Sequence, residues 1–92
     1  MPTVFIPALL RPLTGGQSSV EVEGATVRQV IDHLESAWPG IRDRLLADGK
    51  LRPNISVAVD GEVTPEGLAE VVGPASEVHF IAAIKGGVYQ RL

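Results

Sequence analysis

The feature that most constrains the fold is an apolar run near the end of the chain. Residues 77–84, EVHFIAAI, are apolar at nearly every position except His79. A run of this length indicates an interior strand that is covered on at least one face. The earlier segments therefore have to supply neighbouring strands for this segment and a layer that covers it.

Two segments at the start of the chain are typical of strands. Residues 3–6 are rich in strand formers, and residues 18–23 alternate polar and apolar side chains. The two glycines at 15–16 can supply the positive φ of a hairpin turn, so we expect antiparallel pairing. Pro7 has no N–H to donate to a ladder, which predicts a bulge or an irregular segment over residues 7–12.

The second half of the chain predicts two more strands before the apolar run. Residues 54–59 alternate again, and Asp60-Gly61 is a strong turn pair followed by a short strand at 62–63. Residues 64–76 contain two prolines and two glycines, which predicts a loop with at most one turn of helix.

The covering layer is predicted to be one main helix. Thr26 immediately precedes the predicted helix, and Gln29 lies three positions after Thr26, which is the spacing of a capping box. Apolar residues then recur at helical spacing along one face: Val27, Val30, Ile31, Leu34 and Trp38. Pro39-Gly40 ends this helix. A second short helix is expected over residues 41–47, ending at Asp48-Gly49.

These elements predict a two-layer α+β fold in which one main helix covers a mixed sheet of four to five strands. At 92 residues the chain is expected to form one domain. We place this domain at residues 1–85 and a flexible Gly-Gly tail at residues 86–92. The opening MPTVFIPALL has no basic residues before its apolar stretch, which argues against a signal peptide or membrane span. We therefore expect a cytoplasmic protein.

Composition excludes several classes of function. The chain has no cysteine, so disulfides and thiolate nucleophiles are absent. A net charge of −3 with scattered basic residues argues against nucleic-acid binding. The two histidines, His33 and His79, have no partner set for a metal site, and TGGQ lacks the lysine of a phosphate loop. We predict no catalytic residue, no bound cofactor and no metal.

The remaining candidate is the backbone at the chain end. The apolar run continues directly into Lys85-Gly86-Gly87, and five residues, VYQRL, follow. Glycine has no side chain to pack and loses much conformational entropy on folding, so consecutive glycines suggest a specific need for backbone freedom. The alternative is an ordinary loop dipeptide, as at residues 15–16.

The chain resembles the ubiquitin-like sulfur-carrier family, the ThiS and MoaD-type β-grasp proteins. The resemblance covers the hairpin, the helix, the later strands and the Gly86-Gly87 exit. The segment IPALLRPLTGGQ is especially similar to the carrier of the thiocarboxylate route to cysteine, through Leu-Arg-Pro and Thr-Gly-Gly-Gln.

This resemblance implies that Gly87 is the reactive residue. In such carriers an E1-like enzyme adenylates the terminal glycine with ATP, and the carboxylate then becomes a thiocarboxylate. The family resemblance implies that Gly86 and Lys85 are recognised with the tail. Because Gly87 is joined to Val88, it also implies that a JAMM-type metalloprotease cuts the bond between them.

The resemblance further implies a partner surface on the exposed side of the sheet, with Phe5, Leu10 and Leu13 as anchors. A PLP-dependent cysteine synthase is the favoured sulfur acceptor. A carrier for molybdopterin or thiamine synthesis, a ubiquitin-like protein modifier and a non-covalent β-grasp module with a permanent tail stay open.

Overall fold

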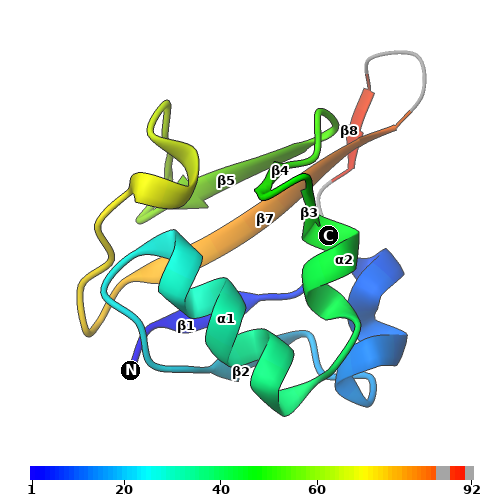
Figure 1. The fold of residues 1–92 in the computed structure, drawn as a ribbon, viewed down its shortest axis with the longest axis horizontal. Helices are drawn as coiled ribbons and strands as arrows, with labels where there is room; N and C mark the ends of the chain where they lie inside the picture. Colours follow the sequence, from blue (N-terminus) through cyan, green and yellow to red (C-terminus); the bar gives the residue numbers. More distant parts are fainter. Residues whose placement is uncertain (85–87, 91–92) are drawn as a thin grey trace.

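The computed structural model describes residues 1–84 and 88–90 as one sheet with a helical layer on one face (Figure 1). The strand order is β2-β1-β7-β5-β6, and β8 also pairs with β7. The strands of this sheet are β1 (Thr3–Phe5), β2 (Ser19–Glu21), β5 (Ile55–Val59), β6 (Glu62–Val63), β7 (Glu77–Ile84) and β8 (Val88–Gln90).

The predicted apolar strand is central in this sheet. β1 pairs with β7 in parallel, whereas β5 pairs with β7 antiparallel on the other side. β1 and β2 form the expected antiparallel hairpin, and β5 and β6 form another. In the β5–β6 turn, Asp60 and Gly61 have φ of 52° and 89°. Two consecutive positive φ values match the right-handed twist of a two-residue hairpin, which explains the Asp-Gly pair.

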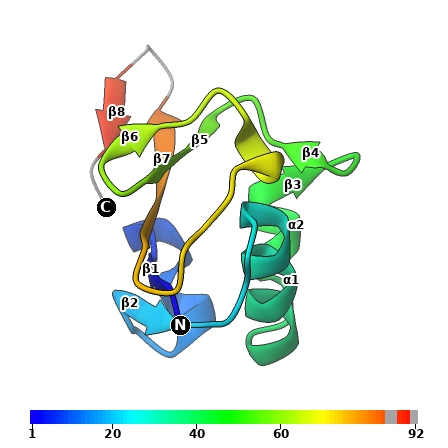
Figure 2. The ribbon, with the colours of Figure 1, turned by 90° about the vertical axis from the view of Figure 1, so that its left-hand side faces the viewer.

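The helix α1 (Val27–Ala37) covers one face of the sheet (Figure 2). Its apolar stripe, Val27, Val30, Ile31 and Leu34, is fully buried. The stripe packs against inward-facing strand residues such as Val4, Val78 and Phe80 to form one hydrophobic core. The predicted cap forms: Thr26 Oγ1 accepts from the N–H of Gln29 at 3.2 Å. The Gln29 side chain reaches back and accepts from the N–H of Ala25 at 2.8 Å, one residue before the N-cap.

The second helix is shorter than expected. α2 (Ile41–Leu45) ends two residues before Ala47, because Leu46 and Ala47 form the strand β3, which pairs with β4 (Lys50–Leu51). Asp48 and Gly49 turn this small hairpin with positive φ at both positions. The prediction of a helix over residues 41–47 is therefore wrong at its C-terminal end.

The segment after Pro7 is regular rather than a bulge. Residues Ala8–Thr14 form the 3₁₀ helix η1, with Pro12 inside it and Gly15 in the left-handed region at its C-terminus. The loop predicted at 64–76 contains one short 3₁₀ helix, η2 (Gly67–Ala69), as expected. The predicted fold class, a mixed sheet covered by one main helix, is confirmed.

Candidate functional site

The tail leaves the fold from its central strand. The inward-facing residues Val78, Phe80 and Ala82 of β7 are all buried in the core. Strands on both sides of β7 supply its backbone partners. The pairing with β5 holds β7 as far as Ala82, and Lys85-Gly86-Gly87 follows Ile84 in the sequence.

The backbone groups of β7 alternate between its two neighbours. The C=O of Ser76 accepts from the N–H of Thr3 on the β1 side, at 2.9 Å. The C=O of Glu77 accepts from the N–H of Asp60 on the β5 side, also at 2.9 Å. Because this direction alternates along a strand, the even-numbered residues Ala82 and Ile84 direct their N–H and C=O away from β5.

The strand β8 lies on the same side of β7 as β1, further along the strand. β5 reaches as far as Ala82 on the other side, through its pairing with Ile55, so that side is occupied. β1 stops at Phe5, and Pro7 lacks the N–H needed to extend the ladder. β8 pairs with the part of β7 that β1 leaves free, with Ala82 opposite Gln90 and Ile84 opposite Val88.

A row of apolar and aromatic residues crosses the face of the sheet that α1 does not cover. Phe5 and His79 stack with ring centroids 4.1 Å apart and an interplanar angle of 8°. His79 is paired with Ala58, which is in turn paired with Val63, so these side chains share one face. We call Phe5, His79, Ala58 and Val63 the open-face row. Val63 is 61% exposed.

An acidic residue lies beside this row. Glu77 is two positions before His79 on β7, and its Oε1 lies 3.7 Å from His79 Nε2. The Glu77 side chain is 61% exposed to solvent, and the His79 side chain is 41% exposed. The stack on Phe5 and the proximity of Glu77 hold the imidazole over this face of the sheet.

The structure describes only some of the residues that were predicted to form the site. Lys85, Gly86 and Gly87 lie outside the described residues, so the division into a domain at 1–85 and a tail at 86–92 stays a prediction. Val88 begins β8, a strand that the sequence did not predict.

The three predicted partner anchors differ in where the structure places their side chains. Phe5 is half-buried and lies in the open-face row. Leu10 is buried in the core, and Leu13 packs half-buried against that core, so their role as anchors stays a prediction. The adjacent Leu9 is instead 70% exposed.

Nothing in the sequence selects Ala58 or Val63, and for His79 it indicates only that partners for a metal site are lacking. A partial signal was available for His79, since it lies between the buried residues Val78 and Phe80 in a predicted strand. That signal places a side chain on a face, but the register across strands is needed to bring the four residues together.

Other features of the described chain supply no alternative centre. Within residues 1–84 and 88–90, no group of three or more histidine or carboxylate residues could hold a metal ion. No helix in the same ranges is long and apolar enough to cross a membrane. A surface depression of about 700 Å³ lies between the start of α1, β4 and η2, and its wall includes Arg28, Lys50 and Glu66. It involves neither β7 nor β8.

The described fold is that of the ubiquitin-like β-grasp class, with its last long central strand leading into a Gly-Gly tail. The chain belongs to the ThiS family, whose model matches residues 4–87. The match ends at Gly87 and leaves the five residues after it outside.

Relatives and solved structures agree with this assignment. The sulfur carrier protein CysO of Mycobacterium tuberculosis is 39% identical over 90 residues, which cover 92% of this chain and 97% of that protein. The Amycolatopsis orientalis BexX/CysO complex contains a chain with a TM-score of 0.89 and 40% identity, covering 95% of this chain and all of that one. SAMP1 of Haloferax volcanii has a TM-score of 0.73 and 29% identity, covering 94% of this chain and 98% of that one.

These comparisons confirm the family predicted from the sequence. They also confirm the predicted type of protein, because the matched relatives with the highest identity are small sulfur carriers rather than enzymes. The sequence features that predicted this family are the Gly-Gly exit and the segment at residues 6–17.

Proposed function

We propose that this protein is a sulfur carrier whose active form ends at Gly87 and carries sulfur there as a thiocarboxylate. Cysteine is the favoured product of the pathway, because the CysO proteins are close in sequence over nearly the whole chain. The observation that supports the position of the reactive residue is the end of the family match at Gly87.

The proposed chemistry takes place in two balanced steps. The carboxylate of Gly87 attacks the α-phosphate of ATP in an E1-like enzyme, forming an acyl-adenylate and releasing pyrophosphate. A sulfide equivalent then attacks the acyl carbon and releases AMP, which leaves the thiocarboxylate. The chain has no cysteine to hold sulfur as a thiol, which is consistent with sulfur carried on the backbone terminus.

Activation first requires that the bond between Gly87 and Val88 be cut. An amide carbonyl has no free oxygen anion to attack a phosphate, so the chain with Val88 attached cannot be adenylated at Gly87. We propose that a JAMM-type metalloprotease removes residues 88–92. The proposal places these steps in the cytoplasm, where ATP is supplied.

The tail has the reach that such a step needs. Once residues 85–87 are extended, three residues add about 10 Å beyond Ile84. Glycines have no Cβ, so two of them can pass through a narrow channel towards a nucleotide. We propose that Lys85 and Gly86 are recognised together with Gly87 during this passage.

The open-face row is the surface we propose for partner docking. The row crosses the central strand β7 at His79, and β7 is the strand that the tail follows, so a partner bound there lies on the strand from which the tail is delivered. We assign Phe5, His79 and Val63 to this surface. The proposed partners are the E1-like enzyme and a sulfur-accepting synthase, with a PLP-dependent cysteine synthase favoured.

A protein modifier is the second candidate function. A small archaeal modifier protein of Haloferax volcanii is 30% identical over 67 residues, 71% of this chain and 73% of that protein. The same adenylated glycine could form an isopeptide bond with a lysine instead of accepting sulfide. This function predicts lysine-linked adducts in cells.

One experiment separates these functions. The full chain is incubated with the host's JAMM-type protease, its E1-like enzyme, ATP and sulfide, and the intact mass is recorded. We expect loss of residues 88–92 followed by a gain equal to one oxygen-to-sulfur exchange. A chain made to end at Gly86 is the matched control and should gain no sulfur. If the chain ending at Gly87 stays at its carboxylate mass, the carrier function is wrong.

A further inference from the structure

We propose that the extension after Gly87 is a built-in edge strand that pairs with β7 and holds the full-length protein in a latent form. The juxtaposition that carries this is β8 on the free edge of β7, directly after the Gly-Gly pair in the sequence. The inference rests on the proposed function only where it speaks of processing.

The first support is the pairing itself. Three residues of β8 lie opposite three residues of β7, in antiparallel register: Ala82 with Gln90, Ala83 with Tyr89, and Ile84 with Val88. Antiparallel pairs alternate between those that exchange two backbone hydrogen bonds and those that exchange none. Since Ala82 and Ile84 direct their backbone groups away from β5, their two pairs are the hydrogen-bonded ones.

The second support is the way the fold leaves this edge free. β1 would cover more of β7 if it continued, but it ends at Phe5 and the chain then enters η1 at Ala8. Pro7 lies in the path of the ladder and has no N–H to donate. An uncovered edge next to a long apolar strand invites pairing with another extended segment, and Val88–Gln90 is the segment that occupies it.

The consequence for function follows from the geometry of a protease cleft. Proteases bind their substrates as extended single strands, and a segment paired to β7 has to separate before it can enter such a cleft. The bond to be cut joins Gly87 to Val88, and Val88 is itself paired with Ile84 in the ladder. Opening of β8 therefore precedes cutting, and cutting removes the link that keeps β8 on the edge.

The pairing can be tested without any enzyme. In the full chain, the amides of Ala82 and Ile84 should exchange with solvent about tenfold more slowly than in the chain ending at Gly87. The shortened chain lacks β8, so both amides lose their hydrogen-bond acceptors there. The Hα atoms of Ala83 and Tyr89 should give a cross-strand NOE, since a non-hydrogen-bonded pair brings its Cα atoms to about 4.5 Å. Equal exchange in both proteins and no NOE would overturn the inference.

A matched pair of proline variants tests the ladder itself. Gln90→Pro removes an N–H that faces Ala82, whereas Tyr89→Pro removes one that faces away from β7. Gln90→Pro removes the N–H that donates to the C=O of Ala82, and this weakens the pair in which the N–H of Ala82 donates to the C=O of Gln90. Exchange of the Ala82 amide should therefore rise about tenfold, whereas Tyr89→Pro should leave it near the native rate. Equal acceleration by both substitutions would contradict the proposed register.

The same variants connect the strand to processing. If opening limits cutting, Gln90→Pro should be cut at the Gly87–Val88 bond about tenfold faster than the native chain, and Tyr89→Pro at the native rate. Equal cutting of all three would contradict latency. If the protease cuts none of them while the NOE and the exchange difference are present, the edge strand stands and the proposed processing is wrong.

Discussion

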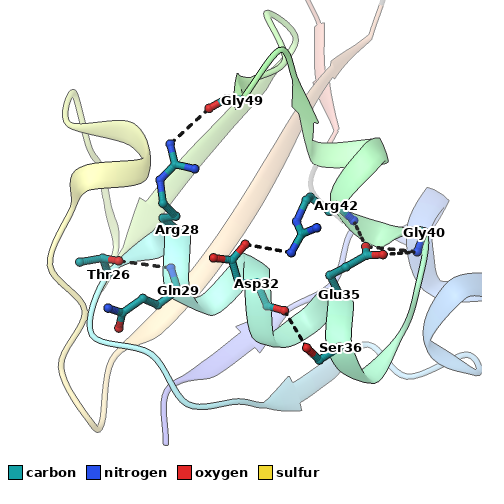
Figure 3. A network of polar contacts seen from close by, with 9 residues as sticks. All are labelled: Thr26, Arg28, Gln29, Asp32, Glu35, Ser36, Gly40, Arg42 and Gly49. Carbon is teal, nitrogen blue, oxygen red and sulfur yellow. Dashed lines mark hydrogen bonds and ion pairs between the residues drawn. The ribbon is translucent and has the colours of Figure 1, made fainter.

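At the scale of single residues, Glu35 connects the two helices. Its side chain leaves α1 and accepts hydrogen bonds from the N–H groups of Gly40 and Arg42 at the start of α2, at 3.1 Å and 2.9 Å (Figure 3). Arg42 in turn pairs with Asp32 of α1 at 3.0 Å. The N–H groups at the start of a helix lack partners within it, and the carboxylate of Glu35 supplies one.

These contacts predict a dependence of stability on pH. The backbone N–H of Arg42, then that of Gly40, holds the pKa of Glu35 below its ordinary value of 4.5. A lowered pKa in the folded state adds stability above the unfolded-state pKa, and this stability is lost as the pH falls through the folded-state pKa. Glu35→Gln should therefore be less stable than the native chain at about pH 7, with the difference shrinking below about pH 4.

Urea unfolding at a series of pH values measures this difference directly. An NMR titration of the Glu35 carboxyl supplies the pKa independently. A stability difference that is the same at neutral and acidic pH would show that Glu35 acts through shape rather than charge.

At the scale of elements, the N-terminus of α1 depends on one hydroxyl. Thr26 Oγ1 accepts the N–H of Gln29, as the capping-box spacing predicted. Thr26→Ala should lower the free energy of unfolding by about 1 kcal/mol, because an N–H of the first turn loses its acceptor. Thr26→Ser keeps the oxygen and is the control. Chemical denaturation of both variants tests this, and equal losses would assign the effect to the methyl group.

Elements with a local signal could be predicted from the sequence. The helix and the main strands follow from periodicity and from turn residues such as Asp60-Gly61. The strand β3 has only part of such a signal, the turn pair Asp48-Gly49. Leu46 and Ala47 continue a helical pattern and become a strand through pairing with β4. β8 is too short to show a period of its own, so its pairing depends on the edge left by β1.

The candidate site was predicted to a similar extent. Its chemistry follows from the Gly-Gly pair, which is visible in the sequence. Its docking surface does not, because adjacent leucines at 9 and 10 are equivalent in pattern and opposite in burial. Only the winding of η1 decides which of the two enters the core.

At the scale of the whole molecule, one face of the sheet is covered by a helix and the other is not. α1 covers one face and forms the core with it (Figure 2). The other face carries the open-face row across β1, β7, β5 and β6. The tail follows β7, the central strand of the sheet. In the proposed function, a partner that activates Gly87 therefore holds the open face and receives the tail without disturbing the core.

Two exposed valines give a matched test of this division. Val63 is 61% exposed in the open-face row, and Val71 is 70% exposed in the loop that bridges to Thr26 beside α1. In the chain ending at Gly87, Val63→Asp should raise the KM of the E1-like enzyme about fivefold or more, because a charge would be desolvated at the contact. Val71→Asp should leave the KM near the native value, and neither substitution should change kcat, since neither residue reaches the reacting atoms. Steady-state pyrophosphate release measures both constants, and a larger effect at Val71 than at Val63 would place the docking surface on the helical side instead.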